Sequence, residues 1–195
     1  MALITAAVPL LAGSLGQGER ERAISELHAT RKMFLDSVAG LSDAQWNFKP
    51  APEVWSVAEV GEHIAVAEDT IFQLITERVM RSPAQPERRV EVEGKDAIVL
   101  EKLIDRSQKA QAPEVLRPTH RWPTQQALID HFKESRDRTI AYVEHTQDAL
   151  RDHFADHPLF KTLDGYQWIL LLSAHSHRHT LQIEEVKANP NFPKK

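Results

Sequence analysis

The most informative absence from this 195-residue sequence is cysteine, which does not occur in it. Without thiols the chain has no disulfides, no zinc–thiolate sites and no cysteine nucleophile. The absence does not identify a compartment, because a cysteine-free chain is compatible with both reducing and oxidising surroundings. Any transition-metal site must therefore be built from the ten histidines or from acidic side chains.

Two other absences exclude classes of function. The net charge is −4 and no basic run is longer than Arg88-Arg89, so the chain lacks the electrostatic signature of a nucleic-acid-binding protein. The apolar N-terminal stretch MALITAAVPLL is shorter than the roughly 20 residues that a transmembrane helix needs. No basic residue precedes this stretch, although the small residues at 12–14 would suit a signal-peptide cleavage site. We therefore expect a cytoplasmic protein without a transmembrane span, with export through this segment as the alternative.

Hydrophobic residues recur at helical spacing in four long segments. These segments cover residues 19–39, 56–80, 124–150 and 165–188. The second and fourth segments open with capping boxes, formed by Ser56 with Glu59 and by Asp164 with Gln167. The fourth ends before Asn189, because the residue before a proline resists helical angles. Four long helices are predicted.

The connecting segments are polar and rich in proline, with one short helical piece at 98–111. No segment alternates convincingly between apolar and polar residues, so the sequence predicts an all-α fold, a four-helix bundle. We expect residues 1–18 to be an apolar arm, 19–189 the bundle and 190–195 a C-terminal tail. The segment HFADH, with His153 and His157 four residues apart, precedes Pro158 and is interpreted as a loop or frayed helix end.

Three histidines are candidates for one metal site. His175 and His179 are one turn apart on the apolar stripe of the fourth helix, so both rings can reach one ion. His177 lies roughly 200° around the helix from them and points elsewhere. His63 occupies the apolar stripe of the second helix. Three neutral imidazoles around a divalent ion, with water in an open position, would avoid the cost of burying unpaired polar rings.

Two alternatives stand beside this hypothesis. Each buried histidine can instead be a core residue with an ordinary hydrogen bond, and His153 with His157 form a rival pair in a less suitable segment. Gln182 lies one turn beyond His179 on the same face, which suggests contact with a ligand ring or with substrate, or packing of its amide against a neighbouring helix. By helical angle Glu62 and Glu68 do not share the direction of His63, so the sequence identifies no general base.

Two stretches of the sequence resemble the DinB-like superfamily of bacterial metal-binding four-helix bundles. They are LSDAQWNFKPAPEVWSVAEVGEHIAVAE and HPLFKTLDGYQWILLLSAHSHRHTLQIEEVK. The most specific pieces are a Trp-Ser pair ahead of a histidine and the pattern H-x-x-x-H-x-x-Q-I, which together comprise Trp55, Ser56, His63, His175, His179, Gln182 and Ile183. The resemblance implies an up-down-down-up helix order, a divalent metal on the matching three histidines, commonly zinc or nickel, and a possible homodimer.

The same resemblance implies a broad range of activities. Characterised relatives include S-transferases that use bacillithiol or mycothiol and a mycothiol-dependent isomerase. We therefore expect a small-molecule substrate, with a low-molecular-weight thiol as a candidate partner, and either a metal-dependent hydrolase or a thiol-dependent S-transferase. The alternative class is a non-enzymatic stress-response or binding module whose metal is structural or absent.

Overall fold

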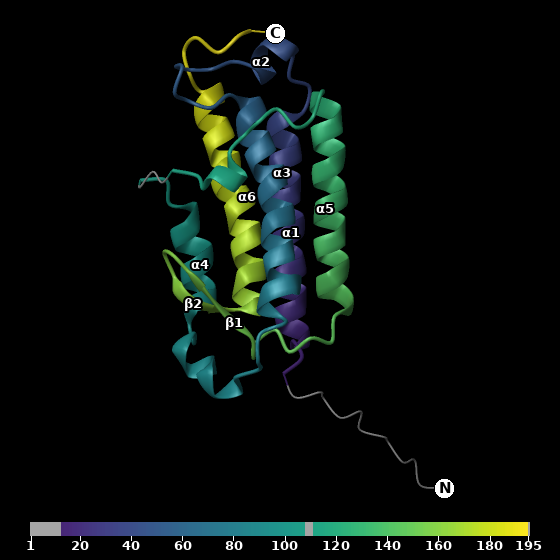
Figure 1. The fold of residues 1–195 in the computed structure, drawn as a ribbon. Helices are drawn as coiled ribbons and strands as arrows, with labels where there is room; N and C mark the ends of the chain where they lie inside the picture. The colour runs from purple at the N-terminus through teal and green to yellow at the C-terminus, as the bar shows by residue number, and fades with distance from the viewer. Residues whose placement is uncertain (1–12, 108–110, 195) are drawn as a thin grey trace, which may run out of the picture.

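The computed structural model describes residues 13–107 and 111–194, in which four long helices pack side by side as a bundle (Figure 1). The long helices are α1 (Gln17–Val38), α3 (Val57–Gln73), α5 (Gln125–His145) and α6 (Gly165–Lys187). Helices α1 and α3 each contact both α5 and α6. The four predicted helices are thus present and enclose one interior. In the described part of the chain no helix is long and apolar enough to cross a membrane.

Helix starts follow the predicted capping chemistry closely. The Ser56 hydroxyl accepts from the backbone N–H of Glu59 at 3.2 Å, and the Glu59 carboxylate accepts from the Ser56 N–H at 2.8 Å. Asp164 and Gln167 exchange the equivalent bonds at the start of α6. Each box satisfies backbone donors that have no partner within the first helical turn. These side chains place the first residue of α3 and of α6 where the sequence predicted.

Helix ends differ more from the prediction. The last turns of the second predicted helix form a π-helical segment, η1 (Leu74–Val79), and the third long helix ends at His145 rather than near Leu150. Leu150 is nevertheless fully buried, because the loop after α5 folds back onto the core. Its apolar character therefore reflected burial of a loop residue and not continuation of the helix.

Short elements occupy the connections. They are α2 (Asp43–Trp46), the 3₁₀ helix η2 (Pro86–Glu91), α4 (Lys95–Ile104) and the 3₁₀ helix η3 (Glu114–Leu116). The helical piece expected at 98–111 begins earlier and ends at Ile104 as α4, which packs along α6 (Figure 1). Residues 1–12, most of the expected apolar arm, lie outside the described residues, whereas Leu15 packs into the core.

A β-hairpin corrects the reading of HFADH as a loop or frayed helix end. Strand β1 (Phe154–His157) pairs antiparallel with β2 (Lys161–Asp164), and Phe154 lies opposite Asp164. Lys161 adopts φ of 60° at the turn. Two four-residue strands are too short to show a clear alternating pattern, and the pairing that stabilises them is not encoded in either strand alone.

A buried ion pair connects all four long helices. Arg136 of α5 is fully buried and donates two hydrogen bonds to the Glu68 carboxylate of α3. Its remaining donors reach the Leu27 carbonyl at 2.6 Å and the Thr30 hydroxyl at 2.7 Å on α1, and Ser176 on α6 at 2.9 Å. All five N–H groups of the guanidinium therefore have acceptors.

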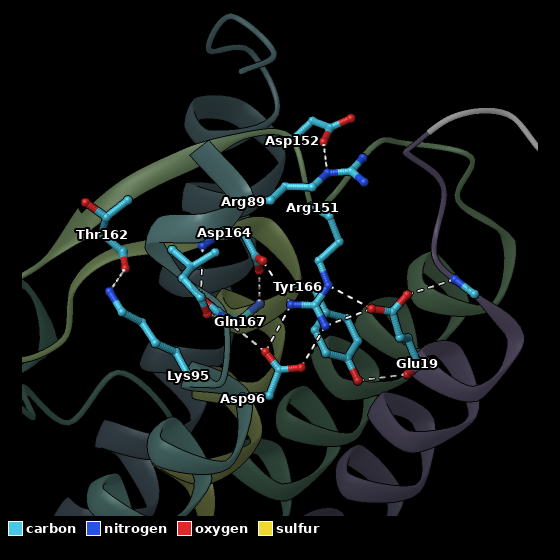
Figure 2. A network of polar contacts seen from close by, with 12 residues as sticks. Glu19, Arg89, Lys95, Asp96, Arg151, Asp152, Thr162, Asp164, Tyr166 and Gln167 are labelled. Carbon is cyan, nitrogen blue, oxygen red and sulfur yellow. Dashed lines mark hydrogen bonds and ion pairs between the residues drawn. The ribbon is translucent and has the colours of Figure 1, made fainter. Parts of the chain in front are cut away.

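A second arginine joins three helix starts at the opposite end from α2 (Figure 2). Arg151 makes ion pairs with Glu19 in the first turn of α1, Asp96 in the first turn of α4 and Asp164 at the start of α6. Its guanidinium carbon also lies 4.1 Å from the centre of the Tyr166 ring. Carboxylates are favourable near helix N-termini, and one cation shared among three of them positions α4 and the hairpin beside α6.

Replacing Arg136 with methionine should lower the free energy of unfolding by about 3–5 kcal/mol, because Glu68 would remain buried without its cation. Urea denaturation measures the change. Arg138→Met is the matched control on α5: the Arg138 side chain is 47% exposed and pairs with Asp69, so the loss should stay within about 1 kcal/mol. The double variant Arg136→Met with Glu68→Leu should recover much of the stability. Equal losses in the two single variants would contradict the role assigned to the buried pair.

Candidate metal centre

Three histidine rings meet between α3 and α6. The Nε2 atom of His63 lies 3.2 Å from Nε2 of His175 and 3.1 Å from Nε2 of His179. One donor atom from each ring lies within 4.8 Å of the others. The structure thus brings together the three histidines that the sequence singled out, because the apolar stripes of α3 and α6 face each other in the bundle.

Backbone and side-chain acceptors determine which nitrogen of two rings carries the proton. The Nδ1 atom of His63 lies 2.9 Å from the carbonyl oxygen of Leu116, and Nδ1 of His179 lies 2.9 Å from Oε1 of Gln182. A carbonyl oxygen only accepts, so each Nδ1 must donate. In a neutral ring the other nitrogen then holds a lone pair. Two Nε2 lone pairs consequently face each other at 3.1 Å, an arrangement that repels unless a cation lies between them.

Burial keeps these rings neutral near pH 7. His63 is only 2% exposed, and its desolvation lowers its pKa, an effect that the hydrogen bond to Leu116 opposes. Desolvation also places the pKa of His175 well below the ordinary value, and it lowers the pKa of His179 to about 3, with the neighbouring His63 adding to the shift. Neutral imidazoles are the form that coordinates metals.

The spacing of the nitrogens suits a divalent ion. Ligands 2.0–2.1 Å from a tetrahedral zinc ion are about 3.3–3.4 Å apart, close to the two separations measured from His63. Within residues 13–107 and 111–194 no carboxylate and no further histidine completes a fourth position in this group. As whole residues, His175 and His179 are partly exposed, whereas His63 is buried. The donor set therefore fits an ion with an exchangeable position.

A polar chain extends from His179 toward the surface. The Gln182 oxygen that accepts from His179 also lies 3.4 Å from an Arg106 guanidinium nitrogen. Arg106 in turn donates two bonds, of 2.6 and 2.7 Å, to Glu185. On the other side of the cluster, the Trp55 ring lies 5.2 Å from the His63 ring, centre to centre.

The remaining histidines lie apart from this cluster. His177 is half-buried; its burial lowers its pKa, and the Glu26 carboxylate of α1 opposes this shift. His153 donates from Nδ1 to the Ser82 carbonyl, and His157 accepts through Nδ1 from backbone N–H groups in the hairpin turn. The two rings of the rival pair therefore make separate hydrogen bonds to the backbone. His131 binds Asp69 at 2.7 Å.

Two contributors to the site were missed by sequence reasoning. The Leu116 carbonyl that orients His63 comes from the last residue of η3, in the connection between α3 and α5, and a backbone acceptor has no signature in side-chain patterns. Glu62 is 3% exposed and binds the same connection through the backbone N–H groups of Thr119, His120 and Arg121. The position of Glu62 next to His63 in the sequence suggested a role at the site. The backbone groups that it binds, however, lie more than fifty residues away along the chain.

Two surface hollows lie away from the histidine cluster. One, of about 560 Å³, is lined by the hairpin residues Asp156, His157, Pro158, Lys161 and Thr162. The other, of about 580 Å³, surrounds Arg151 and the first turns of α1 and α4. Neither is lined by a ring of the histidine cluster.

In the metal-free protein we expect the free energy of unfolding to fall as the pH decreases from about 6.5, the unfolded histidine value, toward 3. The folded-state pKa of His179 is about 3, so in this interval the unfolded chain binds more protons and is favoured. Urea denaturation with chelator at a series of pH values measures the dependence. His179→Gln should make it shallower, and an unchanged slope would contradict a buried neutral ring at this position.

Comparison with known proteins agrees with the helical bundle. A family model described as the DinB superfamily matches residues 26–183. The uncharacterized protein YuaE of Bacillus subtilis (strain 168) is 30% identical over 152 residues, which cover 78% of this chain and 89% of YuaE.

A solved structure also shares the fold. YfiT from Bacillus subtilis, described as "a probable metal-dependent hydrolase with an unusual four-helix bundle topology", superposes with a TM-score of 0.56 at 16% sequence identity, over 92% of each chain. At this identity the likeness concerns the fold alone. The family match spans His63, His175 and His179 together with most of the bundle, and it shows that this chain belongs to the DinB superfamily.

Proposed function

We propose that this protein is a metal-dependent enzyme, most simply a hydrolase, whose divalent ion is held by His63, His175 and His179. The observation that carries the proposal is the pair of Nε2 lone pairs on His63 and His179 that face each other at 3.1 Å, with both Nδ1 atoms committed as donors. When bound, an ion in such a site supplies Lewis-acid activation of water or of a thiol at an open coordination position. Zinc and nickel are the ions proposed.

The residues of this chain supply orientation and neutral ligands. The Leu116 carbonyl holds the His63 ring and Gln182 holds the His179 ring, so both present Nε2 to the same point. Hydrogen bonds of this kind fix the ring and make the ligand nitrogen more basic. Gln182 is therefore proposed to orient a ligand rather than to contact substrate. Partial exposure of His175 and His179 supports access for a small molecule and argues against a sealed structural site.

We also infer the up-down-down-up helix order for the bundle. In Figure 1, α1 and α6 begin at the end of the bundle near the hairpin, whereas α3 and α5 begin at the opposite end. The connection from α3 to α5 contains α4 and η3, which gives it the length to return along the bundle. This crossover also supplies Leu116 to the site.

Replacing His179 with alanine should remove most of the bound metal, whereas replacing His177 should not. The reason is directional: the His179 ring lies in the cluster, and the His177 ring lies toward α1. Elemental analysis of the two purified variants after dialysis against zinc or nickel provides the measurement. Comparable metal loss in both variants would contradict the ligand set.

Hydrolysis should require the metal and should decline at acidic pH. We expect activity on ester, amide or related electrophilic substrates to disappear with chelator and in His179→Ala, and to return when zinc or nickel is added to the wild-type protein. A parallel panel of electrophiles with and without low-molecular-weight thiols distinguishes the hydrolase from a thiol transferase. Metal binding without turnover in either panel would favour the structural or binding role instead.

A further inference from the structure

The loop that follows η3 closes around one buried carboxylate. Glu62 accepts from the backbone N–H of Thr119 at 2.7 Å and of Arg121 at 3.3 Å through Oε1, and from the N–H of His120 at 2.8 Å through Oε2. Three consecutive N–H groups thus converge on one side chain. Such a concave arrangement of backbone donors is a typical binding geometry for an anion.

The backbone of this loop adopts a conformation that an ordinary residue avoids. His120 has φ of 60°, in the left-handed region, where a side chain is unfavourable. This conformation accompanies the convergence of the three N–H groups on Glu62. Residues with such backbone angles persist where surrounding contacts over-determine them. The contacts to the Glu62 carboxylate hold residues 119–121 on both sides of His120.

The anchored residues are connected to the acceptor of His63. The Arg121 side chain donates to the carbonyl of Val115 at 3.2 Å, and Val115 lies in η3 beside Leu116. The Leu116 carbonyl then accepts from Nδ1 of His63. His63 directly follows Glu62 in α3, so one helix segment binds the loop at two points: through the carboxylate of Glu62 and through the imidazole of His63.

We propose that Glu62 is a positioning residue of the metal centre, which holds residues 119–121 and thereby places the Leu116 carbonyl that orients His63. The expected effect of Glu62 on metal affinity rests on the proposed function, in which His63, His175 and His179 bind an ion. Both Glu62 oxygens accept from backbone donors, which is the geometry of an anchor for the loop. A glutamine offers one acceptor oxygen where the loop uses two, and its amide nitrogen would face another donor.

The test compares Glu62→Gln with Glu59→Gln, a control on the same helix whose carboxylate binds Ser56 and Lys49 instead of the loop. The first readout uses metal-free protein: the nitrogen chemical shifts and imidazole N–H resonance of His63 report its tautomer and its bond to Leu116. We expect this resonance to broaden or disappear in Glu62→Gln and to remain in the control. Competition with a chromophoric chelator should then show zinc affinity reduced by about 10–100-fold in Glu62→Gln.

Arg121→Gln provides a second variant that spares the core, because its side chain is 41% exposed. It should reduce zinc affinity in the same direction as Glu62→Gln but to a smaller extent. If Glu62→Gln does not fold, Arg121→Gln carries the test through the same two readouts.

The outcomes separate this inference from the proposed function. A wild-type protein that binds no zinc or nickel overturns the metal site, whereas the His63 resonance in metal-free protein still decides whether Glu62 positions the ring. An unchanged His63 resonance and unchanged affinity in Glu62→Gln would overturn the inference. Lower global stability with both readouts unchanged would overturn it equally, because it would show a purely structural carboxylate.

Discussion

The structure depends on a charge buried at the centre of the bundle. Arg136 uses every donor it has, and its acceptors come from α1, α3 and α6. A slip of any long helix by one turn, about 5.4 Å, would leave the guanidinium or the Glu68 carboxylate buried without a partner. Hydrophobic packing alone tolerates many arrangements of similar volume, whereas an unpaired buried ion is strongly unfavourable. The pair therefore specifies how the four helices align.

This polar layer divides the core. One hydrophobic cluster includes Leu27, Ile140 and Leu172, and the other includes Phe34, Phe132 and Ile183. On these three helices Thr30, Arg136 and Ser176 lie between the residues of the two clusters. His175 and His179 flank Ser176 on α6, so the same alignment that satisfies Arg136 brings His63 to the other two rings. The alignment of the helices in the core therefore also sets the geometry of the candidate metal centre.

The crossover between α3 and α5 completes the site from outside the bundle. It contributes the Leu116 carbonyl, the loop bound by Glu62 and, just after α4, the Arg106 guanidinium near Gln182. The Arg151 network holds the start of α4 against α6 at the hairpin end (Figure 2). In many proteins, the residues that bind ligands lie on connecting segments that rigid helices hold in place. Variation in this connection can alter the surroundings of the histidines without changing the bundle.

Local physics determined much of this protein from the sequence alone. Capping boxes located the starts of α3 and α6, and helical periodicity placed His63, His175 and His179 on inward stripes while directing His177 elsewhere. These features depend on residues within one or two turns of each other. Only the tertiary structure decided that Arg136, which interrupts an apolar stripe, meets Glu68. It also decided that Phe154–His157 pairs as a strand, and that Leu116 and Glu62 support His63. These features depend on contacts between residues distant in sequence or on hydrogen bonds to backbone atoms. The spacing of side chains within one segment carries no information about such contacts.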